Sequence, residues 1–363
     1  MALPDALQAI IAGQLRQRVP GLSMAVIQAD HVPWAQGFGL ADLQARRPAD
    51  ARTIYLWFSM TKIVTATAVM QLADRGQLDL DGAAAEYFPE YAALLRPAGQ
   101  SSVTLRHLLS HSGGLANPLP VGWVHPITAP APDQSAFTRR LLSRQRRLQV
   151  PPGTRVAYSN LGYLVLGEVI ARVSGLPYQQ YVREHLLEPL GMRRTDFMYR
   201  DDLLPDAAVG YQARWHPLTL LLPFLLPRGI VGETVGRYVA FRRFNVDGAA
   251  YGGLIGPVDD AARFVRLHLN AGVVDGQRLL SAEAIGAMQR ITATGPKLEV
   301  GLGWFRERSD RTPGPRYLEH LGGGAGFWND MRIYPDQHLG VVIMGNATSY
   351  DHRRILAAAQ RLA

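Results

Sequence analysis

Segments typical of β-strands stand at both ends of this 363-residue chain, and the residues between them have mostly helical patterns. Residues 22–28 and 34–38 read as two strands near the start. Near the other end, residues 316–320, 328–334 and 339–345 read as three more. This distribution predicts an α+β fold of the α/β-sandwich type, in which one antiparallel sheet is built from both chain ends and flanked by helices.

The domain organisation follows from the same distribution. We expect residues 1–75 and 240–363 to form the α/β sheet domain and residues 76–239 to form a mostly helical inserted domain, with the active site in the cleft between them. Two apolar runs predict buried helices, at 59–74 and at 161–173, and each is followed by a glycine that ends it.

Composition excludes several kinds of site. The chain has no cysteine, so it has no disulfide, thiolate metal site or cysteine nucleophile. The net charge of +8 raises the question of nucleic-acid binding, but the densest basic cluster, at 139–147, reads as the solvated face of one helix, and we expect no nucleic-acid partner. Residues 1–19 read as an amphipathic helix without the features of a secretory signal, which favours a cytoplasmic protein unless a leader was removed.

Lysine is almost absent from the chain. Of 38 lysines and arginines only Lys62 and Lys297 are lysines, so arginine serves nearly everywhere that a positive charge is needed. Arginine cannot be deprotonated in a protein, whereas burial can lower the pKa of a lysine until it accepts a proton. Lys62 is therefore a candidate base.

The motif Ser59-Met60-Thr61-Lys62 stands at the start of the first predicted helix. Residues three apart share a helical face, so the hydroxyl of Ser59 and the amine of Lys62 can meet there. The free N–H groups at a helix start favour an oxyanion, and a nucleophile beside a base is what acyl transfer requires. The alternative is a serine cap and a surface lysine, but the scarcity of lysine and the apolar neighbours favour catalysis.

Tyr158-Ser159-Asn160 directly precedes the second predicted helix. In an extended segment the phenol of Tyr158 and the amide of Asn160 point the same way, so one can relay a proton while the other orients a carbonyl. A tyrosine packed on a helix start with Asn160 as its N-cap explains the triplet equally well.

His320-Leu321-Gly322-Gly323 ends a predicted strand. Glycines there let a substrate lie against the strand, and an N–H beyond them can join that of Ser59 in an oxyanion hole. The alternative is a glycine-rich hairpin turn.

Together, in this order, the three motifs resemble the serine β-lactamase and penicillin-binding-protein superfamily, in particular its class C-like branch, which includes class C β-lactamases, D-Ala-D-Ala carboxypeptidases and family VIII carboxylesterases. The resemblance extends over residues 58–82, 105–115, 151–167, 252–269 and 320–346. It implies that Ser59 is the nucleophile, Lys62 the base and Tyr158 the proton relay.

The same resemblance implies that Asn160 orients the substrate, that His320 and Gly322 line its binding strand, and that the N–H groups of Ser59 and Gly323 form the oxyanion hole, with no metal or other cofactor. Which of Lys62 and Tyr158 holds the proton at rest stays open.

The chain departs from the β-lactamase pattern where that pattern has Lys-Thr-Gly. His320 and Leu321 weaken the binding of a substrate carboxylate, so we expect a carboxylesterase acting on small esters. The alternatives are a D-Ala-D-Ala carboxypeptidase, a D-aminopeptidase or a weak β-lactamase, and, from another class, a catalytically silent binding or regulatory relative.

Two further features have ordinary explanations. His107 and His111 have metal-ligand spacing, but no third ligand is evident, and we expect His111 to support the loop below the cleft. Residues 215–227, which begin with Trp215 and end with Pro227, are very apolar. A buried insert is the default expectation for them, and a lid or a peripheral membrane contact is the alternative.

Overall fold

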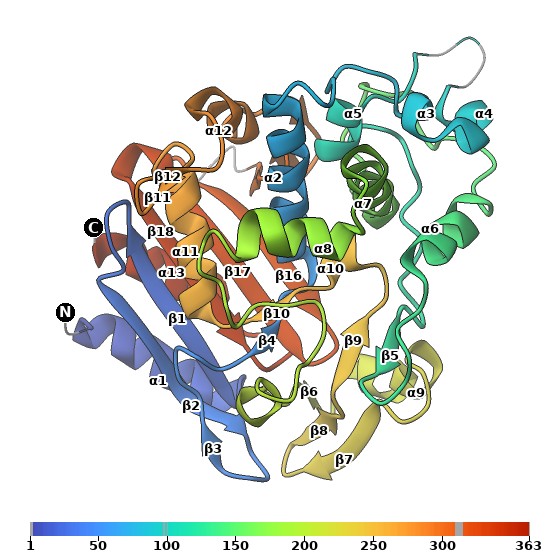
Figure 1. Cartoon of the computed structure of the whole chain (residues 1–363). Helices are drawn as coiled ribbons and strands as arrows, with labels where there is room; N and C mark the ends of the chain where they lie inside the picture. The colour runs from blue at the N-terminus through green and yellow to red at the C-terminus, as the bar shows by residue number, and fades with distance from the viewer. Residues whose placement is uncertain (1–2, 97–98, 100, 309–314, 363) are drawn as a thin grey trace.

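A nine-stranded antiparallel sheet forms the centre of the computed structural model, which describes residues 3–96, 99, 101–308 and 315–362 (Figure 1). Its strands, in spatial order, are β13 (Ala293–Thr294), β14 (Leu298–Val300), β15 (Phe305–Glu307), β16 (Leu318–Gly324), β17 (Phe327–Tyr334), β18 (Leu339–Gly345), β1 (Gly21–Gln28), β2 (Trp34–Asp42) and β3 (Arg47–Pro48). The two chain ends meet where β1 pairs with β18, with Leu22 opposite Gly345. The predicted antiparallel sheet built from both ends is confirmed.

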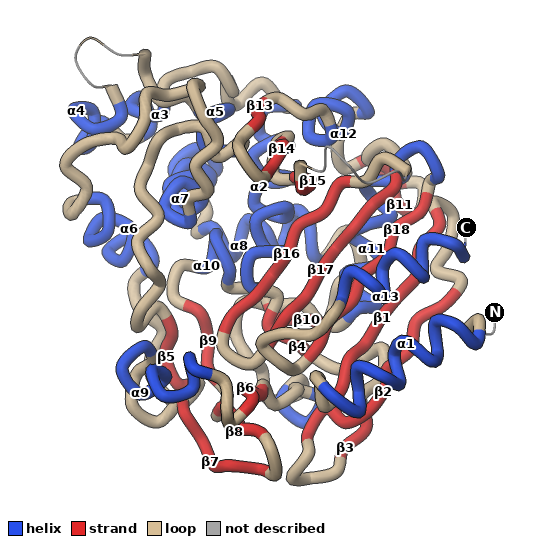
Figure 2. Tube along the Cα trace, turned by 180° about the vertical axis from the view of Figure 1, so that it is seen from behind, coloured by secondary structure: helices blue, strands red, loops and turns tan. Residues whose placement is uncertain are grey.

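Helices cover both faces of this sheet. On one face lie α1 (Asp5–Gln17) and α13 (His352–Ala359), in front of the sheet in Figure 2. On the other face lie α2 (Thr61–Asp74) and α11 (Val258–Leu269), in front of the sheet in Figure 1. Because apolar helices pack against both sides, β18 is buried along its whole length.

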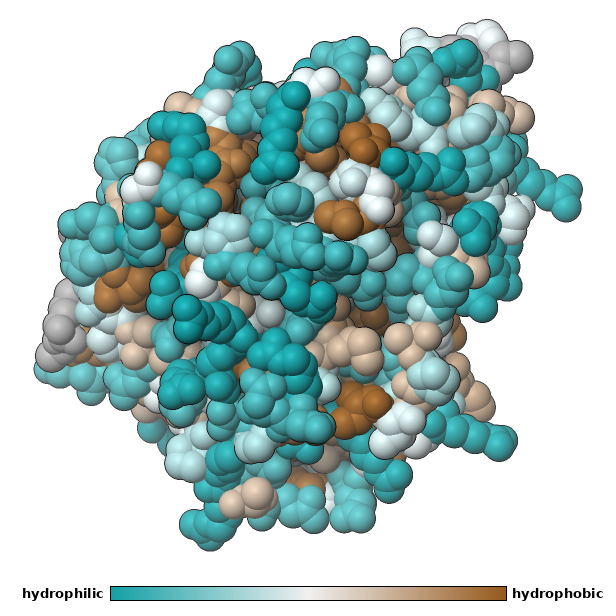
Figure 3. All heavy atoms as spheres, in the orientation of Figure 1, coloured by the Kyte–Doolittle hydropathy of each residue, from teal (hydrophilic) through white to brown (hydrophobic). Residues whose placement is uncertain are grey.

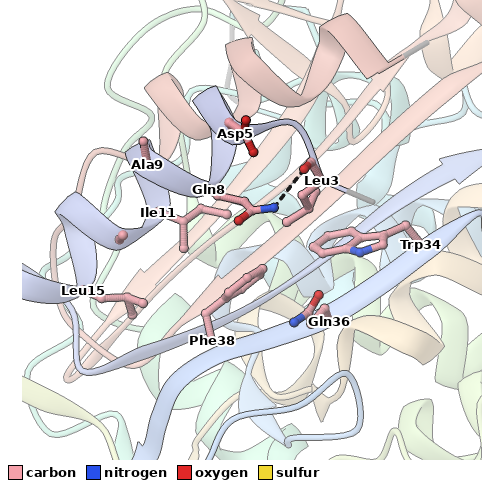
Figure 4. Close-up of a pocket in the computed structure, with 10 residues that line it drawn as sticks. Leu3, Asp5, Gln8, Ala9, Ile11, Leu15, Trp34, Gln36 and Phe38 are labelled. Carbon is pink, nitrogen blue, oxygen red and sulfur yellow. Dashed lines mark hydrogen bonds between the residues drawn. The ribbon is translucent and has the colours of Figure 1, made fainter. Parts of the chain in front are cut away.

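The outer layer with α1 and α13 has its own core. Leu7 and Ile11 of α1 and Ile355 of α13 pack there on strand residues such as Ile343. A groove between α1 and β2, lined by Leu15, Trp34 and Phe38 among others, opens on this side (Figure 4). It lies on the face of the sheet opposite α2.

Further helices, all shorter than α2 except α7, continue the layer that contains α2. They are α3 (Ala84–Tyr87), α4 (Ala92–Leu95), α5 (Leu105–Leu109), α6 (Gln134–Leu142), α7 (Asn160–Ser174), α8 (Tyr178–Val182), α10 (Ala249–Gly252) and α12 (Ala282–Gln289). The second predicted helix is α7, and Gly175, whose φ of 73° suits glycine, ends it as expected. The basic cluster at 139–147 does not lie on one helix face. Helix α6 ends at Leu142, and three of the five arginines of the cluster lie beyond that end.

Small sheets join the remaining segments. They are β4 (Tyr55–Leu56) with β10 (Ile255–Gly256), β11 (Val273–Val274) with β12 (Gln277–Arg278), β5 (Val124–Pro126) with β9 (Phe244–Val246), and β8 (Tyr238–Phe241) between β6 (Tyr211–Ala213) and β7 (Val231–Val235). The face seen in Figure 3 is mainly hydrophilic, with hydrophobic side chains in separate patches.

Residues 215–227 are not a buried insert. They form two short helical turns, η5 (Pro217–Leu221) and α9 (Leu222–Leu225), whose large side chains are mostly exposed. Pro227 favours an extended conformation for Leu226, which ends α9, so the segment forms only short turns. Across the described part of the chain, no helix is long and apolar enough to cross a membrane.

Candidate active site

Ser59 lies in a short 3₁₀ turn, η1 (Phe58–Met60), which leads from β4 into α2. The hydroxyl is partly exposed, whereas Phe58 and Met60 on either side are buried. Phe58 has a φ of 48°, in the left-handed region that costs a side-chain-bearing residue about 1 kcal/mol or more. This conformation orients Ser59 at the N-terminal end of α2, where free backbone N–H groups favour negative charge.

Lys62 lies in the first turn of α2 and is completely buried. Its Nζ donates hydrogen bonds to Ser59 Oγ at 3.0 Å and to the carbonyl oxygen of Tyr251 at 2.8 Å. The serine hydroxyl and the lysine amine therefore meet on one helical face, as the three-residue spacing predicts.

Three tyrosine rings surround the amine of Lys62. Its Nζ lies 5.0 Å from the ring centre of Tyr158, 5.6 Å from that of Tyr163 and 5.1 Å from that of Tyr251. Burial lowers the pKa of Lys62 well below its usual range, because a charged ammonium loses its hydration there. Attraction to the aromatic ring faces compensates for only part of the lost hydration energy of the ammonium. The neutral amine is therefore favoured, and it can accept a proton.

Tyr158 is partly exposed, and its ring packs on that of His111 with centres 4.2 Å apart. Burial raises the pKa of the phenol above its usual value, and the hydroxyl of Ser59 offsets this in part. The phenol is therefore protonated at neutral pH. The lowered pKa of Lys62 and the raised pKa of Tyr158 both favour a resting proton on the tyrosine of this pair.

His111 supports the segment that carries Tyr158. Its Nδ1 accepts a hydrogen bond from the backbone N–H of Ser159 at 3.1 Å, and its carbonyl accepts one from Ala157 at 2.7 Å. Burial, with the nearby Lys62, lowers the pKa of His111 well below its usual value, so the ring stays a neutral acceptor. His107 instead caps α5, where its Nδ1 accepts from the N–H of Thr104, so the two histidines have separate structural roles.

Asn160 is the first residue of α7 and is not its N-cap. The cap is Ser159, whose Oγ accepts from the N–H of Gly162 at 3.1 Å. The N–H of Asn160 donates to Asn117 Oδ1 at 3.0 Å. Its own Oδ1 is buried and has no hydrogen-bond partner among the described residues. Since buried polar atoms are nearly always paired, this oxygen is available to a bound molecule.

His320 lies inside β16, which continues to Gly324, so the motif does not end the strand as predicted. The ring is buried, its Nδ1 lies 2.8 Å from the carbonyl oxygen of Leu321, and its Nε2 has no partner within the described structure. Burial, with a smaller effect from Lys62, lowers the pKa of His320 to about 3. The side chain is therefore uncharged at neutral pH.

Gly322 has a packing role in addition to the predicted role of lining the substrate strand. A Cβ at this position would lie 2.0 Å from the carbonyl oxygen of Trp57 and 3.1 Å from the side chain of Met60, both beside Ser59. The glycine thus lets β16 pack directly against η1. Gly323 follows Gly322 and is exposed.

Sequence patterns did not identify Tyr163 and Tyr251 as neighbours of the base. Tyr163 is held by a hydrogen bond from its hydroxyl to the carbonyl of Leu109 at 2.9 Å. Tyr251 contacts Lys62 through its backbone carbonyl, and such a contact leaves no signal in the choice of side chain. The only indication in the sequence was the family resemblance. Tyr163 lies within its segment 151–167, and Tyr251 lies directly before its segment 252–269.

Nearly the whole chain is similar to proteins of a known family. The family model described as "Beta-lactamase" matches residues 7–363. Among curated proteins, protein flp of Staphylococcus aureus (strain MW2) is 24% identical over 332 residues, which are 91% of this chain and 60% of flp. The chain thus spans about three fifths of the length of that relative.

Solved structures with the same fold include the octameric penicillin-binding protein homologue from Pyrococcus abyssi, with a TM-score of 0.77 and 28% identity over 99% of this chain and 76% of the homologue. EstCE1, described as a hydrolase with promiscuous acyltransferase activity, has a TM-score of 0.76 and 20% identity over 98% of this chain and 96% of its own. At that identity the second likeness concerns the fold alone.

Proposed function

Since the chain belongs to the beta-lactamase family, we propose that it is a serine hydrolase that cleaves small uncharged esters through an acyl-enzyme on Ser59. The observation that carries this proposal is the buried, neutral amine of Lys62, 3.0 Å from the hydroxyl of Ser59. A hydroxyl becomes a nucleophile only when a base takes its proton, and this amine is positioned to do so.

The first half of the reaction forms the acyl-enzyme. Lys62 Nζ takes the proton of Ser59 Oγ as the oxygen bonds to the ester carbonyl carbon, and the electron pair of the carbonyl moves onto its oxygen. The N–H groups of Ser59 and Gly323 bind this oxyanion. When the carbon–alkoxide bond breaks, Tyr158 gives its proton to the leaving alcohol, and the ammonium of Lys62 reprotonates the phenol.

The second half reverses these roles with water as the nucleophile. The Lys62 and Tyr158 pair takes a proton from water, whose oxygen attacks the acyl carbon, and Ser59 leaves with a proton returned to its Oγ. The free Oδ1 of Asn160 accepts a hydrogen bond from a bound water during these steps.

Preference for an uncharged ester is supported by His320. A β-lactam or a peptide C-terminus carries a carboxylate near the bond that breaks, and a fixed cation favours its binding. In this chain the corresponding position holds a buried histidine whose pKa is lowered to about 3. A neutral ring gives such a carboxylate no charge partner, whereas a neutral ester requires none.

The test combines covalent labelling with substrate choice. Intact-mass measurement after exposure to a fluorophosphonate should show one adduct on the native chain and none on Ser59→Ala, and absence of the native adduct would favour a catalytically silent relative. Short-chain p-nitrophenyl esters should be hydrolysed well and a chromogenic cephalosporin poorly. Efficient cleavage of the cephalosporin or of a D-Ala-D-Ala peptide, with esters untouched, would replace the esterase with a peptidase or β-lactamase.

A further inference from the structure

Exposed large hydrophobic side chains gather in one region of the surface. Of the eight among the described residues, seven belong to residues 119–121 and 215–224, and the eighth is Met198. The seven, which we call the apolar platform, are Leu119, Val121, Trp215, Leu218, Leu220, Leu221 and Phe224. Scattered exposed hydrophobic residues are ordinary, but a cluster of this kind marks an interaction site.

The two segments of the platform are joined and held in place. The N–H of Gly122 donates to the carbonyl of Leu225 at 3.1 Å, and α9 lies beside β5 in both Figure 1 and Figure 2. Leu222 is buried beneath the platform, and the hydroxyl of Thr219 donates to the carbonyl of Ala213 at 2.8 Å. The backbone is therefore fixed while Leu220 and Phe224 project into solvent, 80% and 81% exposed.

The charge around the platform is strongly positive. Residues 211–243 contain five arginines and a single acidic residue, Glu233. Arg214, Arg228 and Arg237 are exposed, and the guanidinium of Arg214 lies 5.0 Å from the ring centre of Trp215. Tryptophan, leucine and phenylalanine bordered by arginine suit the boundary between anionic lipid headgroups and acyl chains.

The platform is continuous with the candidate active site. The loop that carries Leu119 and Val121 begins at Asn117, which accepts the N–H of Asn160. It ends at Trp123, whose ring packs edge-on against that of Tyr251 with centres 5.4 Å apart. A surface that binds the platform would thus lie next to the loop that borders the site.

We propose that the apolar platform docks this protein onto the surface of an anionic lipid bilayer, with its Trp, Leu and Phe side chains among the headgroups and its arginines against their phosphates. A second copy of the chain is a poorer occupant, because pairing two platforms would bring the exposed arginines of both copies together.

Sedimentation with lipid vesicles tests the docking. The native chain should bind vesicles of phosphatidylcholine mixed with phosphatidylglycerol, and bind phosphatidylcholine alone more weakly. Leu220→Ser with Phe224→Ser should weaken binding about tenfold or more, since both side chains lose their apolar burial. Arg214→Gln should weaken binding to the anionic vesicles about fivefold and leave binding to phosphatidylcholine unchanged.

The matched control is Met198→Ser, which removes the exposed hydrophobic side chain outside the platform and should leave binding unchanged. Thermal melting verifies that each variant is folded. The proposal is overturned if the native chain binds neither kind of vesicle, or if the platform variants bind as the native chain does. It is also overturned if the native chain is an oligomer in gel filtration that the double variant converts to monomer. Because the assay measures binding, it is independent of the activity of Ser59.

Discussion

The side chain of Lys62 is fully buried beside Ser59, and its two hydrogen bonds reach neutral oxygens. Arginine at this position keeps the positive charge but cannot lose its proton, so it cannot take the proton of the serine hydroxyl. We expect Lys62→Arg to lower kcat by about a hundredfold to ten-thousandfold, the usual contribution of a general base.

Steady-state kinetics on a p-nitrophenyl ester measures this effect, and circular dichroism shows whether the larger guanidinium disturbs the fold. The only other lysine of the chain is Lys297, which is exposed. Lys297→Arg is therefore the matched control and should behave as the native chain. Near-native rates in folded Lys62→Arg would contradict the role of this amine.

The ring and the hydroxyl of Tyr158 have separable roles. Tyr158→Phe keeps the ring that stacks on His111 and removes only the phenolic proton. We expect kcat to fall by roughly a hundredfold or more with a smaller change in KM, because the leaving alcohol loses its proton donor. If the variant unfolds in the same circular dichroism assay, the tyrosine serves packing and not proton transfer.

At the scale of elements, the contact between β16 and η1 depends on the missing side chain of Gly322. An alanine Cβ would lie 2.0 Å from the carbonyl oxygen of Trp57, so the strand and the turn must separate. We expect Gly322→Ala to lower the free energy of unfolding by about 1–3 kcal/mol, as overpacking does. It should also lower kcat, because η1 carries Ser59.

Urea unfolding and ester hydrolysis measure the two effects of Gly322→Ala. Gly286 is the matched control, since it lies inside α12 and a Cβ there meets nothing within 4 Å. Gly286→Ala should raise the free energy of unfolding by about 0.5–1 kcal/mol, through better helix propensity, and leave kcat unchanged. Equal stability of both variants would mean that the strand and turn can adjust without cost.

Helices and strands with a clear hydrophobic period, or with a glycine that ends them, could be predicted from the sequence. Five of the nine strands of the main sheet, and α7 with its stop at Gly175, follow from such patterns, and the meeting of Ser59 with Lys62 follows from helical spacing. The short strands β3, β13, β14 and β15 were not predicted. The left-handed conformation of Phe58 could not be predicted, because no residue preference indicates it. The packing of Gly322 against Trp57 joins segments far apart in the chain, so the glycines read as a substrate surface or a turn.

At the scale of the whole molecule, buried neutral histidines tie stability to pH. Burial lowers the pKa of His268 and His320 to about 3 and that of His352 to about 4. In the unfolded chain each would titrate near about 6.5. Between these values the unfolded state binds more protons, so the free energy of unfolding falls as the pH falls from about 6.5 towards 4.

Urea unfolding at pH 7, 6 and 5 should show this loss, at most about 1.4 kcal/mol per pH unit for each histidine. His268 is remote from the proposed chemistry, with its ring between Thr67 and Trp304, so His268→Gln should reduce the slope by about one such contribution. His31→Gln, at an exposed position, should leave the slope unchanged. A slope that is the same in all three chains would exclude His268 as a source of the acid sensitivity.

The domain division remains a proposal: residues 1–75 with 240–363 form one unit, residues 76–239 form the other, and the site lies between them. In keeping with it, every strand of the main sheet comes from residues 21–48 or 293–345. Strand patterns at the two chain ends predicted this arrangement. They could not predict that 215–227 would be exposed, because an apolar run has the same composition whether it faces a core or a membrane.

The pairing of β1 with β18 has a consequence for synthesis on the ribosome. Strand β1 leaves the ribosome long before its partner β18, which is translated only at residues 339–345. At about 5–20 residues per second, β1 waits roughly 16–60 seconds with one row of N–H and C=O groups unpaired. A nascent chain that stalls in this interval exposes an apolar strand edge to its neighbours, so native assembly of the sheet must follow the synthesis of β18.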